Sequence, residues 1–205
     1  MLTIHHLGIS QSERVIWLCE ELGIPYNLIR YERTAKMSAP PEYKALHPLT
    51  TAPVITDGDL VLGESGAIVE YISRRHGGGR LILGPEHPDF ADYLFWFHYA
   101  NGSMVPAFIM DMVSQRLGQA NPIARTEIGV AMVEKRLGEA TWFAGEEFTL
   151  ADIMMLFPLT RGRSFWSRDI SGLPNLVAYL QRIGERPAYR RAMETAEPGV
   201  PLPLT

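Results

Sequence analysis

The sequence lacks three features that would point to particular classes of protein: a second cysteine, a long hydrophobic run and a basic cluster. Because Cys19 is its single cysteine, it cannot form an intramolecular disulfide, and a cytoplasmic location is expected. No apolar run approaches the roughly 18 residues of a membrane span, and the N-terminus has no signal-peptide pattern. Cys19 completes the apolar stripe of a predicted helix, so we expect it in the core.

The charge balance and the histidines argue against two further classes. A formal net charge of -4, without any run of Lys or Arg, argues against general nucleic-acid binding. The six histidines show no metal-ligand spacing, so no metal site is predicted. With 46% hydrophobic and 20% charged residues, the chain has the composition of a globular protein that buries a sizeable core.

The pattern of the first 76 residues predicts a small mixed sheet with helices against it. An alternating pattern over 2–7 and a β-rich segment at 26–31 predict two strands. The polar segment 32–48 is broken by prolines, so we expect a loop with at most a short helix near 42–46. Between the two strands, apolar residues at helical spacing predict a helix that ends at Gly23: Val15, Leu18, Cys19 and Leu22.

The stretch 49–65 combines a proline turn, a hairpin and the start of a helix. Pro53 directly precedes two β-formers, where a cis peptide bond would form a tight turn. The Asp-Gly pair at 57–58 predicts a hairpin whose second strand is 60–62. Beyond it, apolar spacing predicts a helix that includes 67–72.

These elements predict a site for a peptide that has a free amino-acid end. At the turn, the N–H and C=O of Ala52 would face outward and pair with an extended peptide as an added antiparallel strand. At the helix start, Ser65 would hold a carboxylate through its hydroxyl and its N–H. Glu64 beside it would take an ammonium group.

The remainder of the chain is predicted to be helical. Glycines and prolines mark a linker at about 77–88, which divides a first domain at 1–80 from an all-helical domain at 89–205. The predicted elements of the second domain are a helix from 90 to about 117 kinked at Pro106, a helix from Pro122 to about 137, a helix after the capping pattern of Thr149 and Asp152, and helices opening near Pro174 and Pro187.

Two hydroxyl groups, on Ser10 and Ser12, precede the first predicted helix. A hydroxyl donor at a helix N-terminus is well placed to stabilise a thiolate. The alternative is structural, because Ser10-Gln-Ser-Glu13 is a capping-box pattern and Ser12 also suits an N-cap. The residues alone leave both interpretations open.

Motifs along the whole chain resemble those of the glutathione S-transferase superfamily. In the first half they are HHLGISQSERVIWLCEELG at 5–23, APVI at 52–55 and ESGAIVEY at 64–71. In the second half they are FTLADI at 148–153, PNL at 174–176 and RPAY at 186–189. The order of these motifs is more specific than any one of them, and the first-helix pattern resembles the serine-type bacterial and fungal branch.

The resemblance implies a thioredoxin-like N-terminal domain, ordered β-α-β-α-β-β-α, and an all-helical C-terminal domain. It implies that Ser10, or as second choice Ser12, donates a hydrogen bond to the sulfur of glutathione, the co-substrate. It also implies a homodimer. The residues that would bind glutathione are Thr51, Ala52, Pro53, Glu64 and Ser65. The electrophile pocket is predicted to include Met104 and Phe108, since methionine repacks easily, although residues at such spacing are also typical of a core.

The expected reaction is attack by the glutathione thiolate on a small hydrophobic electrophile, in a detoxification role. Glutathione-dependent peroxidase, dehalogenase or isomerase activity is an alternative, and so is a non-catalytic binding module. Two departures from the family pattern motivate the last: Thr50-Thr51 replaces Gly-Lys, and Asn101 stands where relatives have an acidic residue. The lost lysine would weaken glutathione binding by about 1 to 2 kcal/mol if no other group replaces it.

Overall fold

The computed structural model describes residues 1–118, 125–161, 169–202 and 204. The chain forms two compact units, one made of Met1–Arg80 with Gly184–Leu202 and the other containing Leu81–Ile183. The predicted helical domain at 89–205 differs from the second unit at its C-terminal end, because the last helix packs with the first 80 residues.

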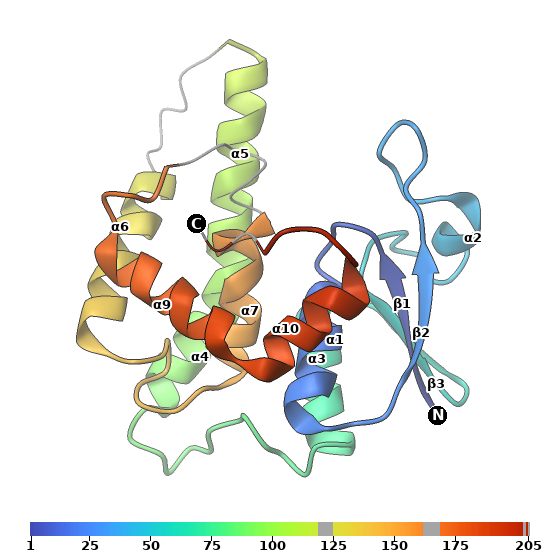
Figure 1. Ribbon diagram of the computed structural model, residues 1–205, viewed down its shortest axis with the longest axis horizontal. Helices are drawn as coiled ribbons and strands as arrows, with labels where there is room; N and C mark the ends of the chain where they lie inside the picture. The colour runs from blue at the N-terminus through green and yellow to red at the C-terminus, as the bar shows by residue number, and fades with distance from the viewer. Residues whose placement is uncertain (119–124, 162–168, 203, 205) are drawn as a thin grey trace. The chain divides into compact units, whose positions relative to one another are not determined.

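The first unit is built on a four-stranded mixed sheet in the order β2-β1-β3-β4 (Figure 1). Strand β1 pairs in parallel with β2 and antiparallel with β3, and β3 pairs antiparallel with β4. The strands are β1 (Leu2–Leu7), β2 (Asn27–Tyr31), β3 (Val54–Asp57) and β4 (Leu60–Leu62). The predicted strand at 2–7 and the predicted hairpin are therefore confirmed, with Gly58 at φ 61° supplying the left-handed position of the turn.

Three helices follow the strands in the predicted thioredoxin-like order. They are α1 (Glu13–Leu22), α2 (Pro41–Lys44) and α3 (Ser65–Arg75). Figure 1 shows α1 and α3 on one side of the sheet and α2 on the other. The apolar stripe of α1 is fully buried, including Cys19, and the helix ends at Gly23 in a left-handed conformation, as predicted. Burial raises the pKa of the Cys19 thiol to about 12, with Glu20 adding to the effect.

The last helix of this unit, α10 (Pro187–Ala196), packs along α1. The rings of Tyr189 and Trp17 meet edge to face with centroids 5.3 Å apart. The guanidinium of Arg186 donates two hydrogen bonds of 2.7 Å to the carboxylate of Glu21. These contacts join the end of the chain to the first helix.

The second unit is helical. Its elements are α4 (Phe90–Tyr99), the π-helical segment η1 (Ala100–Met104), α5 (Val105–Arg116), α6 (Arg125–Glu139), α7 (Leu150–Leu159) and α9 (Pro174–Glu185). The predicted start of a helix at Pro122 lies outside the described residues.

The single kinked helix predicted from 90 to about 117 is instead three consecutive segments. The segments α4 and α5 are separated by η1, where the N–H of Val105 bonds to the carbonyl of Ala100, five residues back. Pro106 is the second residue of α5 and so lies in its first turn, where proline is tolerated without its N–H.

Helix α7 begins with the predicted capping box. The Thr149 hydroxyl accepts a 3.2 Å hydrogen bond from the N–H of Ala151, and Asp152 accepts one of 2.9 Å from the N–H of Thr149. Asp152 is fully buried and also accepts from the N–H of Phe143 and the hydroxyl of Tyr179. Burial raises the pKa of Asp152 to about 6, although these hydrogen bonds act to lower it.

Across the described parts of the chain, no helix combines the length and apolar character needed to cross a membrane. The same residues contain no group of three His, Cys, Asp or Glu side chains arranged to hold a metal ion.

Candidate functional site

The turn before β3 has the backbone conformation that its sequence suggests. The peptide bond between Ala52 and Pro53 is cis, and Pro53 is buried at the entrance to the strand. Pairing of β1 with β3 extends from Leu2–Asp57 to His5–Val54, so half-buried Ala52 lies beyond the paired residues. Its backbone occupies the end of a strand, where an extended ligand can add on. Thr51, beside it, is exposed.

Glu64 and Ser65 form the entrance to α3. Glu64 is the N-cap residue and adopts φ 65° and ψ 110°, a conformation that non-glycine residues rarely take. Its side chain is exposed, whereas Ser65 is only 3% exposed at the first helical position. The N-terminus of an eleven-residue helix offers N–H groups and a partial positive charge to an anion at this point.

A buried arginine of α1 hydrogen-bonds to the side chain of Ser65. Arg14 donates a 3.0 Å hydrogen bond to the Ser65 hydroxyl and a second bond to the amide oxygen of Gln11. Ser65 in turn donates to the same Gln11 oxygen at 3.3 Å. Burial lowers the pKa of Arg14 to about 9, while the charge of Glu13 acts in the opposite direction.

Sequence reasoning gave no role to Arg14 or Gln11. A signal was present, because Arg14, Leu18 and Leu22 are spaced by four and share one face of α1. A charged residue on the buried face of a helix requires polar partners, and those partners lie at the candidate site.

Ser10 and Ser12 lie next to each other in the loop after β1. The Ser10 hydroxyl donates to the carbonyl of Leu7 at 2.6 Å and lies 2.7 Å from the Ser12 hydroxyl. Ser10 is 6% exposed and Ser12 is fully buried, so Ser10 is the more accessible donor. Ser12 is the N-cap residue of α1, but its hydroxyl makes no capping hydrogen bond to the helix. The capping hydrogen bond predicted for Ser12 is therefore not formed, whereas the Ser10 hydroxyl accepts a 3.3 Å hydrogen bond from the N–H of Ser12 in the turn that leads into α1. The structural interpretation of Ser10 thus stays a prediction beside the catalytic one.

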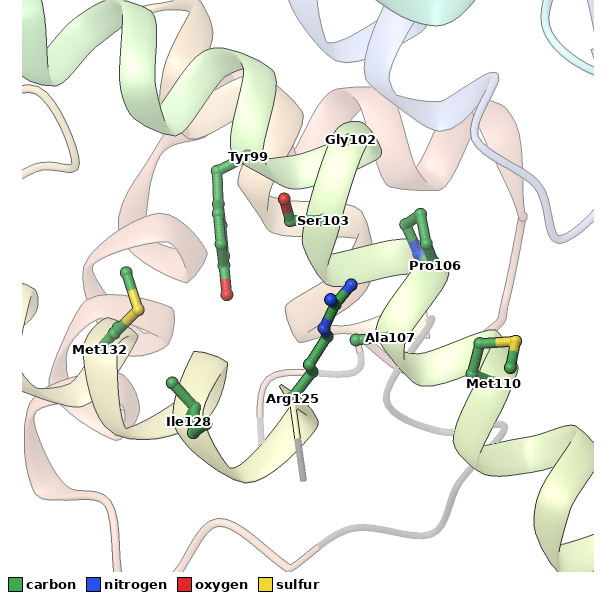
Figure 2. Close-up of a pocket in the computed structure, with 9 residues that line it drawn as sticks. All are labelled: Tyr99, Gly102, Ser103, Pro106, Ala107, Met110, Arg125, Ile128 and Met132. Carbon is green, nitrogen blue, oxygen red and sulfur yellow. The ribbon is translucent and has the colours of Figure 1, made fainter. Parts of the chain in front are cut away.

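The second unit contains a cavity of about 520 Å³ between η1–α5 and α6. Figure 2 shows Tyr99 and Arg125 directed into the space between these helices. The cavity is lined by Tyr99, Gly102, Ser103, Pro106, Ala107, Met110, Arg125, Ile128 and Met132. The predicted pocket residues Met104 and Phe108 do not line it, and at 2% and 4% exposure they pack inside the unit. Their assignment to an electrophile pocket stays a prediction.

Two family models match the chain, one on each half. The model described as "Glutathione S-transferase, N-terminal domain" matches residues 10–75. The model described as "Glutathione S-transferase, C-terminal domain" matches residues 104–187.

Individual proteins are similar over nearly the full length. Glutathione S-transferase 3 of Schizosaccharomyces pombe is 30% identical over 222 residues, which cover 96% of this chain and 88% of that protein. A crystal structure of a glutathione S-transferase from Actinobacillus pleuropneumoniae superposes with a TM-score of 0.86 at 34% identity, covering 96% and 93% of the two chains. A glutathione transferase of Phanerochaete chrysosporium, crystallised with oxidized glutathione, shares the fold at 21% identity and a TM-score of 0.75, covering 95% and 94%.

Proposed function

The chain belongs to the glutathione S-transferase family and functions as a glutathione transferase, and we propose that it joins the thiolate of bound glutathione to a small hydrophobic electrophile. The observation that supports this proposal most directly is the position of the Ser10 hydroxyl, nearly buried at the loop that leads into α1. A hydroxyl there can donate to the glutathione sulfur once its proton turns from the Leu7 carbonyl.

The contribution of such a donor can be bounded. A thiol of pKa about 8.5 is about 3% thiolate at pH 7, and lowering the pKa by about two units makes the thiolate the major form. The gain is at most roughly 30-fold in thiolate, and lower intrinsic nucleophilicity offsets part of it. Orientation of the electrophile must supply the remainder of the rate enhancement.

We assign the glutathione contacts to three neighbouring segments of the first unit. The backbone of Ala52, whose peptide bond to Pro53 is cis, would pair with the cysteinyl residue of glutathione. Glu64 and Ser65 would hold the γ-glutamyl end at the start of α3. Thr51 would face the glycine carboxylate with a neutral hydroxyl where a lysine is usual.

The residue type at position 10 favours transfer to carbon. A cysteine there would form a mixed disulfide with glutathione, which a serine cannot do. Reduction of a peroxide by the bound thiolate remains the second candidate, because it needs the same stabilised sulfur. A panel of electrophiles and hydroperoxides separates the two, and a preference for hydroperoxides would replace the first proposal with the second.

The finer assignments are also proposals. We place the protein in the serine-type bacterial and fungal branch on the basis of its first-helix motif, in the cytoplasm on the basis of its single buried cysteine, and in detoxification on the basis of the reaction. We propose a homodimer, which the large apolar side chains exposed on α5 support: Ile109, Met110 and Val113. A monomer in sedimentation velocity would contradict the dimer.

Calorimetry with reduced glutathione tests the assigned contacts. We expect binding by the wild type and an affinity about fivefold to thirtyfold higher in Thr51→Lys, because the added cation meets the glycine carboxylate. Thr34→Lys, on another loop of the same unit, is the matched control for added charge and should leave the affinity unchanged. Absence of binding to the wild type at millimolar glutathione would overturn the proposed site.

A further inference from the structure

A continuous series of polar contacts connects Ser10 with the carboxylate of Glu197, the residue that follows α10. Ser10 Oγ lies 2.7 Å from Ser12 Oγ, and Ser12 Oγ lies 2.7 Å from His6 Nδ1. On the other side of the ring, His6 Nε2 lies 3.2 Å from Glu197 Oε1 and 3.1 Å from the Ala196 carbonyl. All these residues belong to the first unit, and His6 and Ser12 are completely buried.

The partners of the histidine define the direction of the hydrogen bonds. Both groups that face Nε2, a carboxylate and a carbonyl, are acceptors, so Nε2 carries a proton. In the neutral ring Nδ1 then has a lone pair, which accepts from the Ser12 hydroxyl. The single Ser10 proton is directed at the Leu7 carbonyl, and when it turns to the Ser12 oxygen the donors run from Ser10 through Ser12 to His6.

We propose that His6 takes up the thiol proton of bound glutathione through Ser10 and Ser12, with Glu197 stabilising the imidazolium that results. This inference rests on the proposed function, because it requires a thiol beside Ser10. His6 does not contact the substrate; it acts through the two serines. The structural alternative is that these polar contacts only hold the loop after β1 against the end of α10.

The proposed step conserves protons and moves no electrons between molecules. The sulfur–hydrogen bond of glutathione breaks as its proton passes to Ser10 Oγ. The Ser10 proton passes to Ser12, and the Ser12 proton passes to His6 Nδ1, where a new N–H bond forms. The result is a thiolate that accepts a hydrogen bond from Ser10 and an imidazolium paired with Glu197. The donor and acceptor roles along this series of hydrogen bonds are thereby reversed, and Ser10 now donates its proton to the sulfur.

The groups around Glu197 hold the carboxylate in place. Glu197 Oε1 also accepts a hydrogen bond from the N–H of Ile9, and Arg30 on β2 lies 3.9 Å from Oε2. Arg33 donates to the carbonyls of Gly8 and Ile9 in the same loop. Of these charged groups, Glu197 contacts His6 directly, Arg30 contacts Glu197, and Arg33 contacts the backbone of the loop.

Proton counting during glutathione binding tests the proposal. Calorimetry at pH 7 in buffers of different ionisation enthalpy gives the protons released per glutathione, and ultraviolet absorbance gives the thiolate formed. S-methylglutathione, which has no thiol proton, supplies the baseline. We expect the wild type to release close to no protons per thiolate, because His6 keeps them. In His6→Asn, which retains a polar partner for Ser12, we expect one proton released per thiolate and at least fivefold less thiolate at pH 7.

His5→Asn is the matched control, since His5 is the neighbouring residue of β1 and bonds to Tyr31 and Thr56 instead. It should leave both readouts unchanged. Release of one proton per thiolate by the wild type would overturn the relay, and this measurement needs no variant. Glu197→Gln is the second variant, expected to lower the thiolate fraction at least twofold; an unchanged fraction in both variants would favour the structural alternative. Failure of the wild type to bind glutathione would instead overturn the proposed function together with the relay.

Discussion

Two hydroxyl residues precede helices in this protein, and they are used differently. Thr149, before α7, accepts a hydrogen bond from the helix backbone, and Asp152 completes a capping box. Ser12, before α1, makes no capping hydrogen bond with its side chain. Its hydroxyl bonds to His6 and Ser10 instead. The N–H groups of Val15 and Ile16 are served by the backbone carbonyl of Ser12.

The difference shows that hydroxyl residues before a helix can form other hydrogen bonds than a helix cap. Ser10-Gln-Ser-Glu13 and Thr149-Leu-Ala-Asp152 both fit the capping-box sequence. The second forms the box, whereas in the first the N–H of Glu13 donates to the Ser10 carbonyl and the Ser10 hydroxyl accepts from the N–H of Ser12. In the second unit the polar atoms stabilise a helix start. In the first unit the equivalent hydroxyls face each other in the loop where the proposed reaction takes place. Variants at the two helix starts can therefore separate a contribution to stability from a contribution to turnover.

The largest effect is expected at the α7 capping box. Asp152→Ala removes the acceptor for the N–H groups of Phe143 and Thr149 and for the Tyr179 hydroxyl, all of which are buried. Leaving buried donors unsatisfied should lower the free energy of unfolding by about 3 to 5 kcal/mol. Denaturant unfolding measures this change. A loss below about 1 kcal/mol would show that the box contributes little.

Asp152→Asn, whose side chain does not ionise, is the control for the pH dependence of the stability. The raised pKa of about 6 compares with about 3.9 in the unfolded chain, so the folded state binds more protons between these values. The part of the stability that is linked to protonation of Asp152 is therefore complete below about pH 4 and is lost as the pH rises through about 6. The loss is at most about 3 kcal/mol. The difference in unfolding free energy between wild type and Asp152→Asn should fall across this range. A difference that stays constant with pH would contradict the raised pKa.

At the other helix start the main effect should be on turnover. Ser10→Ala removes the proposed donor to the glutathione sulfur, and turnover should fall at least tenfold while glutathione affinity stays within about threefold. Steady-state kinetics and calorimetry measure the two quantities. Ser38→Ala, an exposed loop serine, is the matched control. If Ser10→Ala turns over normally, the thiolate donor must be Ser12 or another group.

The sequence was most informative where local pattern and tertiary packing agree. The strand at 2–7, the stripe of α1 with its stop at Gly23, and the hairpin at 57–58 follow from periodicity and turn chemistry within a few residues. The resemblance to the family then supplied the thioredoxin-like order, which the structure confirms. Neither the local pattern nor the family resemblance predicts which side chains contact one another.

The parts that sequence reasoning missed depend on contacts between distant residues. His6 and Glu197 are 191 positions apart, and Arg14 and Ser65 are 51 apart, so no local pattern joins them. Helical spacing also does not say which residues of an all-helical unit line a cavity, so it did not single out Tyr99 and Arg125, and the assignment of Met104 and Phe108 to an electrophile pocket stays a prediction. The π-helical segment η1 needs the same tertiary information.

The smallest expected effect compares the two cap hydroxyls directly. Thr149→Ala and Ser12→Ala each remove one buried hydroxyl, so each should lower the free energy of unfolding by about 1 to 2 kcal/mol. Turnover per folded molecule should then differ, falling about threefold to fivefold in Ser12→Ala because Ser10 loses its link to His6, and staying constant in Thr149→Ala. Unfolding curves and steady-state kinetics on the same preparations measure both. Equal turnover in the two variants would mean that the Ser12 hydroxyl, although diverted from the helix, serves only the packing of its loop.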